Sequence, residues 1–311
     1  MSADVSAWTE RLYPALREFA DARTDLSPET LGGVRVALDR RRRESAQALD
    51  TFGVAVAGGR AALGRRSVPV RIYRGGPSPA PAVVYCHSGA FVLGNLDVDQ
   101  LQCVELARRG QCTVVAMDYR LAPEHPYPAA LDDAAMVLGW VAANADELDV
   151  DHHRIAVAGS SAGGALAALL AQRSAAGTAP PVVFQLLHQP VLDDRPTRSK
   201  REFVDTPGFD GPATEAMWRH WLGGRAAPDA AVPARIPETT GLPEAFISCS
   251  ELDPLRDEAL DYARRLIDGG VSTELHVFAG TCHGFDSLLP EWEVSRELFS
   301  MQGAALRRAL H

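Results

Sequence analysis

The chain has 311 residues, of which 46% are hydrophobic, and 40 acidic against 31 basic residues give it a net charge of −9 at pH 7. This length predicts two domains or one large α/β unit with insertions, and the composition excludes a disordered, collagen-like or low-complexity chain. Because nucleic acids and anionic membranes both attract cationic surfaces, the negative charge argues against either as the main partner.

The N-terminal residues and the apolar runs predict a soluble, cytoplasmic protein. Residues 1–10 contain Asp4 and Glu10 and lack an apolar h-region, so we expect no secretory signal. The longest nearly apolar run, residues 164–171, is too short to cross a bilayer. The basic run 40–43 is interpreted as the solvated face of a helix, with an anion or partner contact as the alternative.

The cysteine and histidine patterns do not indicate a metal site. The five cysteines are scattered without a CxxC pair, which predicts buried, reduced thiols. His152 and His153 are adjacent and therefore do not share a helix face, as the ligands of an HExxH motif must. We expect neither a metal nor any other cofactor.

The predicted elements change in character after residue 50. Before it, apolar residues recur at helical spacing from Trp8 to Phe19, and Ser27-Pro28-Glu29 predicts the start of a second helix. Strand-like runs follow at 68–73, 82–86, 113–117, 155–158, 182–187, 245–249 and 272–278. Helices are expected near 97–109, 129–144, 162–176, 255–268 and 292–309. This alternation predicts a largely parallel central sheet with helices on both faces.

Residues 193–243 interrupt the alternation. This segment is charged and proline-rich, with one short helical piece, 214–222, that contains Trp218 and Trp221. A connection of this length inside a domain is typical of a lid or a binding insertion. We expect it to form, together with the N-terminal helices, a cap over the carboxyl edge of the sheet. The alternative is that the two tryptophans only form the core of the insertion.

The segment Gly159-Ser160-Ser161-Ala162-Gly163 matches the pattern G-x-S-x-G. Residue frequencies alone produce such a match about 0.1 times in a chain of this length, so the predicted strand before it and helix after it carry the argument. A sharp strand-to-helix turn needs small flanking residues, and it presents the serine beside a helix N-terminus. Ser161 is therefore the candidate nucleophile.

A serine hydroxyl attacks a carbonyl only if a base accepts its proton and a carboxylate orients that base. Asp253 and His283 follow the last two strand-like runs, at the edge where ligands bind in open α/β sheets. Asp253 is preferred to Asp257, because an acid in the first turn of a helix is expected merely to complement the helix dipole. Glu251 is the alternative acid.

Acyl transfer also needs hydrogen-bond donors for the developing oxyanion. The loop His87-Ser88-Gly89-Ala90-Phe91 follows a strand-like run, at the place where an HGGG-type loop supplies backbone N–H groups. The N–H group of Ala162, the residue after the nucleophile, is expected to supply another.

Together these segments resemble the hormone-sensitive-lipase-like α/β-hydrolases, a family of carboxylesterases. The resemblance runs from about Pro69 to the C-terminus and rests on segments 87–94, 118–130, 159–164, 253–257 and 283–285 in the family's order. It implies the α/β-hydrolase fold with a helical cap. It also implies a catalytic triad of Ser161, Asp253 and His283, and an oxyanion hole formed by Gly89, Ala90 and Ala162.

Two residues depart from the family pattern. Ser88 stands where the family usually has glycine, and a positive φ at that position would cost serine on the order of 1 kcal/mol. Ser160 stands where one large subgroup has aspartate, which leaves the acyl preference open. Ser88, Ser160 and Trp218 are the expected substrate contacts.

The domain and function predictions follow from these features. Residues 1–55 are expected to form an N-terminal cap segment, 56–192 and 244–311 the hydrolase core, and 193–243 an insertion that contributes to the cap. The resemblance implies a serine carboxylesterase that hydrolyses small, short-acyl esters through an acyl-enzyme intermediate. Alternatives are an amidase or a deacetylase of a specific metabolite. A non-catalytic small-ligand receptor is less favoured, because the receptor known with this fold lacks the catalytic histidine, whereas this chain has His283. The expected partner is a small-molecule ester, and a homodimer is one alternative for the oligomeric state.

Overall fold

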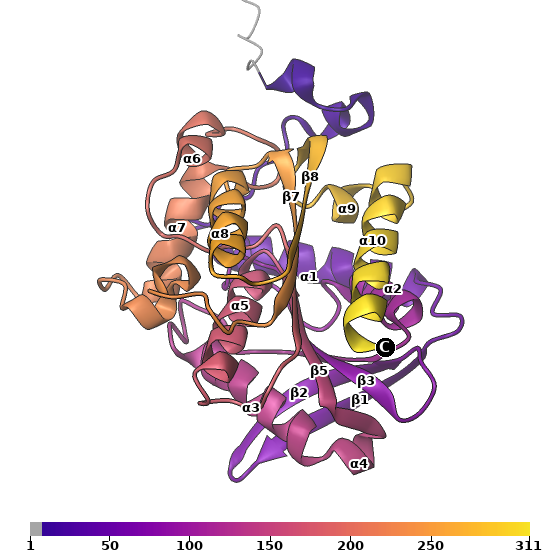
Figure 1. Ribbon diagram of the computed structural model, residues 1–311. Helices are drawn as coiled ribbons and strands as arrows, with labels where there is room; N and C mark the ends of the chain where they lie inside the picture. The colour runs from indigo at the N-terminus through magenta and orange to yellow at the C-terminus, as the bar shows by residue number, and fades with distance from the viewer. Residues whose placement is uncertain (1–7) are drawn as a thin grey trace, which may run out of the picture.

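The computed structural model describes residues 8–311, and its centre is a single eight-stranded sheet (Figure 1). The strands are β1 (Ala55–Leu63), β2 (Arg66–Arg74), β3 (Ala80–Cys86), β4 (Thr113–Met117), β5 (Val150–Ser160), β6 (Phe184–His188), β7 (Glu244–Leu252) and β8 (Thr273–Cys282). Their order in the sheet is β1-β2-β4-β3-β5-β6-β7-β8. The β1–β2 and β2–β4 pairs are antiparallel and all other neighbours are parallel, which confirms the expected mostly parallel sheet.

Helices cover both faces of the sheet because its central strands are apolar on both sides. In β3, Ala82 and Val84 belong to one hydrophobic core, whereas Val83 and Tyr85 belong to the other. The first core is shared with α3 (Ala129–Ala143), α5 (Ala162–Ala175) and α8 (Arg256–Asp268). The second is shared with α2 (Gln100–Gly110) and α10 (Glu293–Leu310), which lie side by side in Figure 1. Two short helices, α4 (Ala145–Leu148) and α9 (Phe285–Leu288), complete this part of the chain.

The N-terminal segment differs from the sequence expectation. The predicted helix from Trp8 to Phe19 is two short 3₁₀ helices, η1 (Thr9–Arg11) and η2 (Pro14–Phe19), followed later by α1 (Leu31–Ala48). Pro14 explains the break, since it has no N–H group to donate and forces the preceding Tyr13 into an extended conformation, with ψ 138°. Trp8, Leu12 and Leu16 are nevertheless buried in a cluster with Phe278 of β8 and Leu298 of α10, and Phe19 is half-buried beside it.

β1 is a strand that sequence patterning missed. Of its nine residues only Ala61 is buried, and the strand contains two glycines and four alanines. It forms because its backbone pairs along the whole length of β2, not because its side chains fill a core. The seven strands that were expected are all present, with β6 beginning at Phe184 instead of residue 182.

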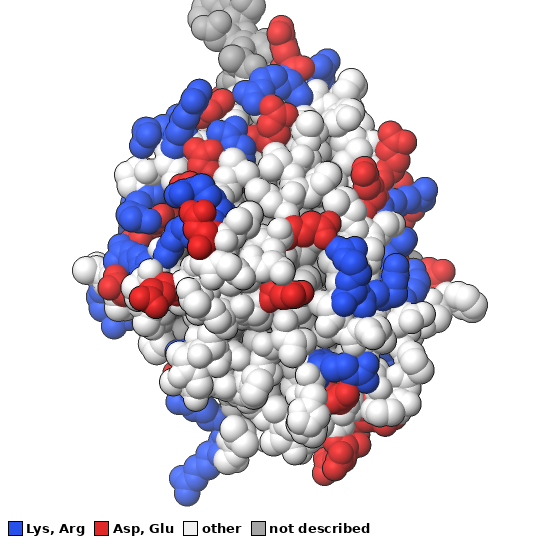
Figure 2. All heavy atoms as spheres, in the orientation of Figure 1, with Lys and Arg blue, Asp and Glu red and all other residues white. Residues whose placement is uncertain are grey.

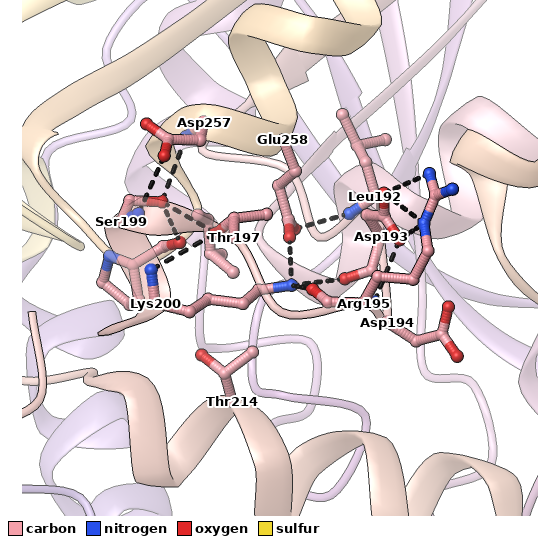
Figure 3. Close-up of polar contacts among 12 residues, drawn as sticks. Leu192, Asp193, Asp194, Arg195, Thr197, Ser199, Lys200, Thr214, Asp257 and Glu258 are labelled. Atoms are coloured by element: carbon pink, nitrogen blue, oxygen red, sulfur yellow. Dashed lines mark hydrogen bonds and ion pairs between the residues drawn. The ribbon is translucent and has the colours of Figure 1, made fainter. Parts of the chain in front are cut away.

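The insertion 193–243 contains α6 (Arg198–Glu202), α7 (Gly211–Leu222), η3 (Asp229–Ala231) and η4 (Pro233–Arg235). Figure 3 shows how α6 is held against α8 by polar contacts. Lys200 Nζ lies 2.6 Å from Glu258 Oε2, and Ser199 donates its N–H to Asp257 at 2.8 Å and its hydroxyl to the Pro254 carbonyl at 2.7 Å. The insertion is thus attached to the segment that immediately follows Asp253.

The surface and the helices agree with the composition. On the face shown in Figure 2, acidic and basic side chains are intermixed and neither sign forms an extended patch. All five cysteines are buried and form no disulfide. Within residues 8–311, no helix combines the length and the apolar character that a membrane span requires.

Candidate active site

Ser161 occupies a sharp turn between β5 and α5, with φ 54° and ψ −118°. A positive φ at a non-glycine residue is strained by about 1–3 kcal/mol and persists only where its surroundings enforce it. Here the Ser161 N–H donates to the His188 carbonyl at 2.8 Å. The flanking glycines are required by close backbone contacts, since a Cβ on Gly159 would lie 2.2 Å from the Gly163 carbonyl oxygen and one on Gly163 would lie 2.0 Å from that of Cys86.

His283 joins Ser161 to Asp253 through two hydrogen bonds. Its Nε2 lies 3.0 Å from Ser161 Oγ, and its Nδ1 lies 2.8 Å from Asp253 Oδ2. Asp253 follows β7 and His283 follows β8, so adjacent parallel strands bring both to the edge where the Ser161 turn lies. The Asp253 side chain is fully buried, and its Oδ1 accepts the Leu255 N–H at 2.8 Å, which leaves Oδ2 for the histidine.

Electrostatics favours the protonated form of His283. Burial on its own lowers the pKa of this imidazole, but the charge and hydrogen bond of Asp253 outweigh burial and raise the pKa above its usual value. The buried acids Asp286 and Glu258 add to the rise. The arrangement therefore stabilises the imidazolium that forms when the histidine accepts a proton.

The other acids considered from sequence have different partners. Glu251 forms an ion pair with Arg11 at 2.6 Å and accepts the Gly280 N–H at 2.8 Å. Asp257 accepts the Ser199 N–H, as described above. The acid that the structure brings to His283 is the preferred one, Asp253.

The loop after β3 has an unusual backbone. Gly89, Ala90 and Phe91 have φ values of 131°, 53° and 61°. Residues that carry a side chain rarely adopt the backbone conformation of Gly89, and a Cβ there would lie 2.1 Å from the Leu93 carbonyl oxygen. No described residue accepts a hydrogen bond from the backbone N–H of Gly89 or Ala90. Ser88 does not have a positive φ, so the strain considered for a serine at that position does not arise.

A cleft of about 290 Å³ surrounds these groups. Its lining includes Ser88, Gly89, Ala90, Ser160, Ser161, Gln189 and His283, together with Arg23, Leu38, Asp39, Arg41 and Arg42 from the N-terminal segment. A second cavity of about 240 Å³ adjoins it and shares Arg42, Val98, Ser160, Asp286 and Ser287. Two arginines of the basic run thus face the cleft.

Trp218 is an expected substrate contact that the structure does not bring to the cleft. Its side chain is 6% exposed and lies in the main hydrophobic core, with its ring 6.4 Å from that of Phe91. Its position matches the alternative interpretation, in which the tryptophans form the core of the insertion. Ala162, the expected third oxyanion donor, is buried at the first position of α5.

Gln189 is a site residue that sequence reasoning missed. It follows β6 with φ 45°, and its Oε1 accepts the N–H of Gly284, next to His283, at 2.6 Å. Its Nε2 donates to Ser250 Oγ at 3.0 Å, and that hydroxyl donates to the Cys282 carbonyl at 2.9 Å. The loop on both sides of His283 is thereby held. Its place directly after a strand, at the same edge as Asp253, is the signal that could have identified it.

The described part of the chain contains no group of three histidine, cysteine or acidic side chains arranged to hold a metal ion.

Comparisons with known proteins agree with this geometry. A family model described as an α/β hydrolase fold matches residues 83–287. Two proteins of Mycobacterium tuberculosis are each 40% identical: esterase LipI over 237 residues (75% of this chain and 74% of LipI) and carboxylesterase NlhH over 259 residues (80% of each). The crystal structure of esterase LipW from Mycobacterium marinum is 57% identical and superposes with a TM-score of 0.96 over 98% of both chains. The expected fold class and the expected kind of enzyme, a hydrolase, are confirmed, and the chain belongs to the hormone-sensitive-lipase-like family of α/β-hydrolases.

Proposed function

We propose that the protein is a serine carboxylesterase in which Ser161 is the nucleophile, His283 the general base and Asp253 the residue that orients the imidazole. The observation that carries this proposal is the hydrogen-bond chain from Asp253 through His283 to Ser161, located in a cleft. The names of the relatives, which are esterases and a carboxylesterase, support the choice of an ester as the scissile group.

The geometry leads to a two-step reaction. His283 Nε2 takes the proton of Ser161 as Oγ attacks the ester carbonyl, and Asp253 stabilises the imidazolium through Nδ1. The N–H groups of Gly89, Ala90 and Ala162 receive the negative charge of the tetrahedral intermediate. His283 then protonates the leaving alcohol as the acyl-enzyme forms. A water molecule, deprotonated by the same histidine, attacks the acyl carbon and releases the acid and free Ser161.

The size of the cleft supports small substrates with short acyl chains. Binding sites for drug-sized ligands commonly enclose about 300–1,000 Å³, and the cleft that contains Ser161 measures about 290 Å³. Residues 8–55 and the insertion 193–243 form the proposed cap, since Arg23, Leu38 and Phe209 from these segments line the cleft. Ser88 and Ser160 line the cleft; Ser160 is the proposed polar substrate contact, because the Ser88 hydroxyl is already bound to Asp99. A cytoplasmic location and a homodimer stay predictions.

A series of p-nitrophenyl esters tests the proposal. We expect kcat/KM to be highest for acetate to butyrate and to fall for longer chains, because the volume of the cleft lies at the lower end of the range for ligand sites. Ser161→Ala lowers kcat by about 10⁴-fold or more, as removal of a triad nucleophile does. Ser300→Ala is the matched control, since Ser300 is exposed on α10. Activity retained by folded Ser161→Ala protein would overturn the assignment.

Paired substrates separate this function from its rivals. An ester and an amide with the same acyl group distinguish an esterase from an amidase, and we expect the ester to be the better substrate. A receptor without catalytic activity would bind small ligands but leave an organophosphonate unreacted. The direct contact between His283 and Ser161 favours reaction.

A further inference from the structure

The carboxylate of Asp99 holds the residue that precedes the proposed oxyanion donors. Its Oδ2 accepts the backbone N–H of Ser88 at 2.7 Å, and its Oδ1 accepts the Ser88 hydroxyl at 2.9 Å. A third donor, the hydroxyl of Tyr85 at the end of β3, reaches Oδ2 at 3.0 Å. Both oxygens of the carboxylate are thus directed at the start of one loop.

The position of Asp99 makes this choice of partners informative. Asp99 is the N-cap residue of α2, where an aspartate ordinarily accepts a hydrogen bond from an N–H group of the first helical turn. Its side chain makes no such capping bond here. By contrast, Asp210 at the N-cap of α7 accepts the Ala213 N–H at 2.9 Å. The carboxylate of Asp99 therefore does not cap α2 but accepts hydrogen bonds from Ser88.

The loop needs external support because its own conformation is strained. Ala90 and Phe91 both have a positive φ, which costs non-glycine residues about 1–3 kcal/mol each. On one side the loop is fixed by Tyr119, whose ring stacks on His87 at 4.1 Å and whose hydroxyl donates to the His87 carbonyl at 2.8 Å. Asp99 fixes the next residue, directly before the N–H groups of Gly89 and Ala90.

We propose that Asp99 is a positioning residue for the oxyanion hole: its carboxylate clamps Ser88 through the backbone N–H and the hydroxyl, and so aims the N–H groups of Gly89 and Ala90 at the developing oxyanion. The serine that replaces the family's usual glycine is the second half of the clamp. This inference rests on the proposed esterase function, because it assigns a support to the donors of that mechanism.

The clamp acts on the transition state more than on substrate binding. Misaimed donors stabilise the tetrahedral oxyanion less, while the contacts of the bound ester change little. Asn in place of Asp99 removes the negative charge and one acceptor oxygen, so the bonds that fix Ser88 lose their charge assistance and the Ser88 hydroxyl can no longer donate to that oxygen. We expect Asp99→Asn to lower kcat about 10- to 100-fold, less than the 10²–10³-fold typical for complete removal of a donor. Ser88→Ala, which keeps the backbone bond, lowers kcat by a few fold.

The test compares Asp99→Asn, Ser88→Ala and the double variant with wild type on p-nitrophenyl acetate. The affinity of a trifluoromethyl ketone, which forms a charged tetrahedral adduct with the serine, is measured for each. We expect kcat and inhibitor affinity to fall in parallel, KM to stay within about twofold, and the double variant to lose less than the product of the single losses. Asp210→Asn is the matched control: it also removes an N-cap charge, and we expect it to leave kcat unchanged and the protein folded, because asparagine caps a helix about as well as aspartate.

Two outcomes would overturn the proposed role of Asp99. An unchanged kcat in Asp99→Asn, or a loss of kcat with full inhibitor affinity, overturns the clamp. If Asp99→Asn does not fold, Ser88→Ala alone decides, because unaltered kcat and inhibitor affinity in that variant exclude a role for the hydroxyl. Failure of the esterase proposal is distinguishable, since it appears as absent hydrolysis by wild type or as full activity of Ser161→Ala.

Discussion

The buried ion pair between Lys200 and Glu258 predicts a pH-dependent loss of stability in Lys200→Met (Figure 3). The two side chains are 10% and 0% exposed. Lys200 Nζ also donates to the Arg195 carbonyl at 3.1 Å, and Glu258 Oε1 accepts the Leu192 N–H at 2.7 Å. Even with these partners, burial raises the pKa of Glu258 from 4.5 to about 7.

The sign and size of the effect follow from proton linkage. In wild type, Glu258 binds a proton in the native state but not in the unfolded state between pH 4.5 and about 7, so its contribution to stability falls as pH rises through that window. Methionine removes the cation, which moves the native pKa of Glu258 higher and extends the fall to more alkaline pH. Breaking a buried pair in this way costs about 3–5 kcal/mol. The penalty is present at pH 8 and shrinks at pH 5, where Glu258 is protonated in both proteins.

Thermal and urea unfolding at pH 5 and pH 8 measure this difference. With an unfolding entropy of about 2.1 cal/mol/K per residue, the expected loss at pH 8 lowers Tm by about 5–8 °C. Lys200→Met combined with Glu258→Gln recovers most of it, because no buried charge is left unpaired. Arg198→Met, which removes an 84% exposed charge from the same helix, is the control and changes stability by less than about 0.5 kcal/mol. An equal loss at both pH values, or none at pH 8, would refute the reasoning.

Three further predictions concern the site. Gly163→Ala places a Cβ 2.0 Å from the Cys86 carbonyl oxygen, so we expect a loss of at least about 2 kcal/mol in urea unfolding. Because the raised pKa of His283 depends on Asp253, and catalysis needs the neutral imidazole, wild-type kcat/KM falls as pH drops through that pKa. In Asp253→Asn the acidic limb of the pH profile moves to lower pH while kcat falls about 10⁴-fold. Trp218→Phe leaves KM unchanged, since Trp218 lies outside the cleft lining; a several-fold increase in KM would show that it contacts substrate.

The parts of the fold that sequence predicted are those whose pattern arises from burial. The central strands bury both faces, so they appear as short β-branched runs, and β3, β4 and β5 occur where such runs do. Strand β1 has no such pattern because backbone pairing with β2, and not side-chain burial, holds it in the sheet. The N-terminal segment kept its helical spacing of apolar residues, but Pro14 outweighed that spacing.

The same distinction applies to the site. Ser161, Asp253 and His283 could be proposed because each directly follows a strand of one parallel sheet, and the carboxyl ends of such strands share an edge. The contact between Asp99 and Ser88 could not, because an aspartate before a helix is expected to cap that helix. Only the direction of its side chain, which the folded structure places toward the loop after β3, shows otherwise.

The central claim is that Ser161 carries the acyl group during turnover. Rapid acid quenching during hydrolysis of p-nitrophenyl acetate, followed by peptide mass spectrometry, measures this directly. We predict a mass increase of one acetyl group on the peptide that contains Ser161, absent in Ser161→Ala. An acetyl group found on another residue, or hydrolysis that continues at the wild-type rate in Ser161→Ala, would contradict the account.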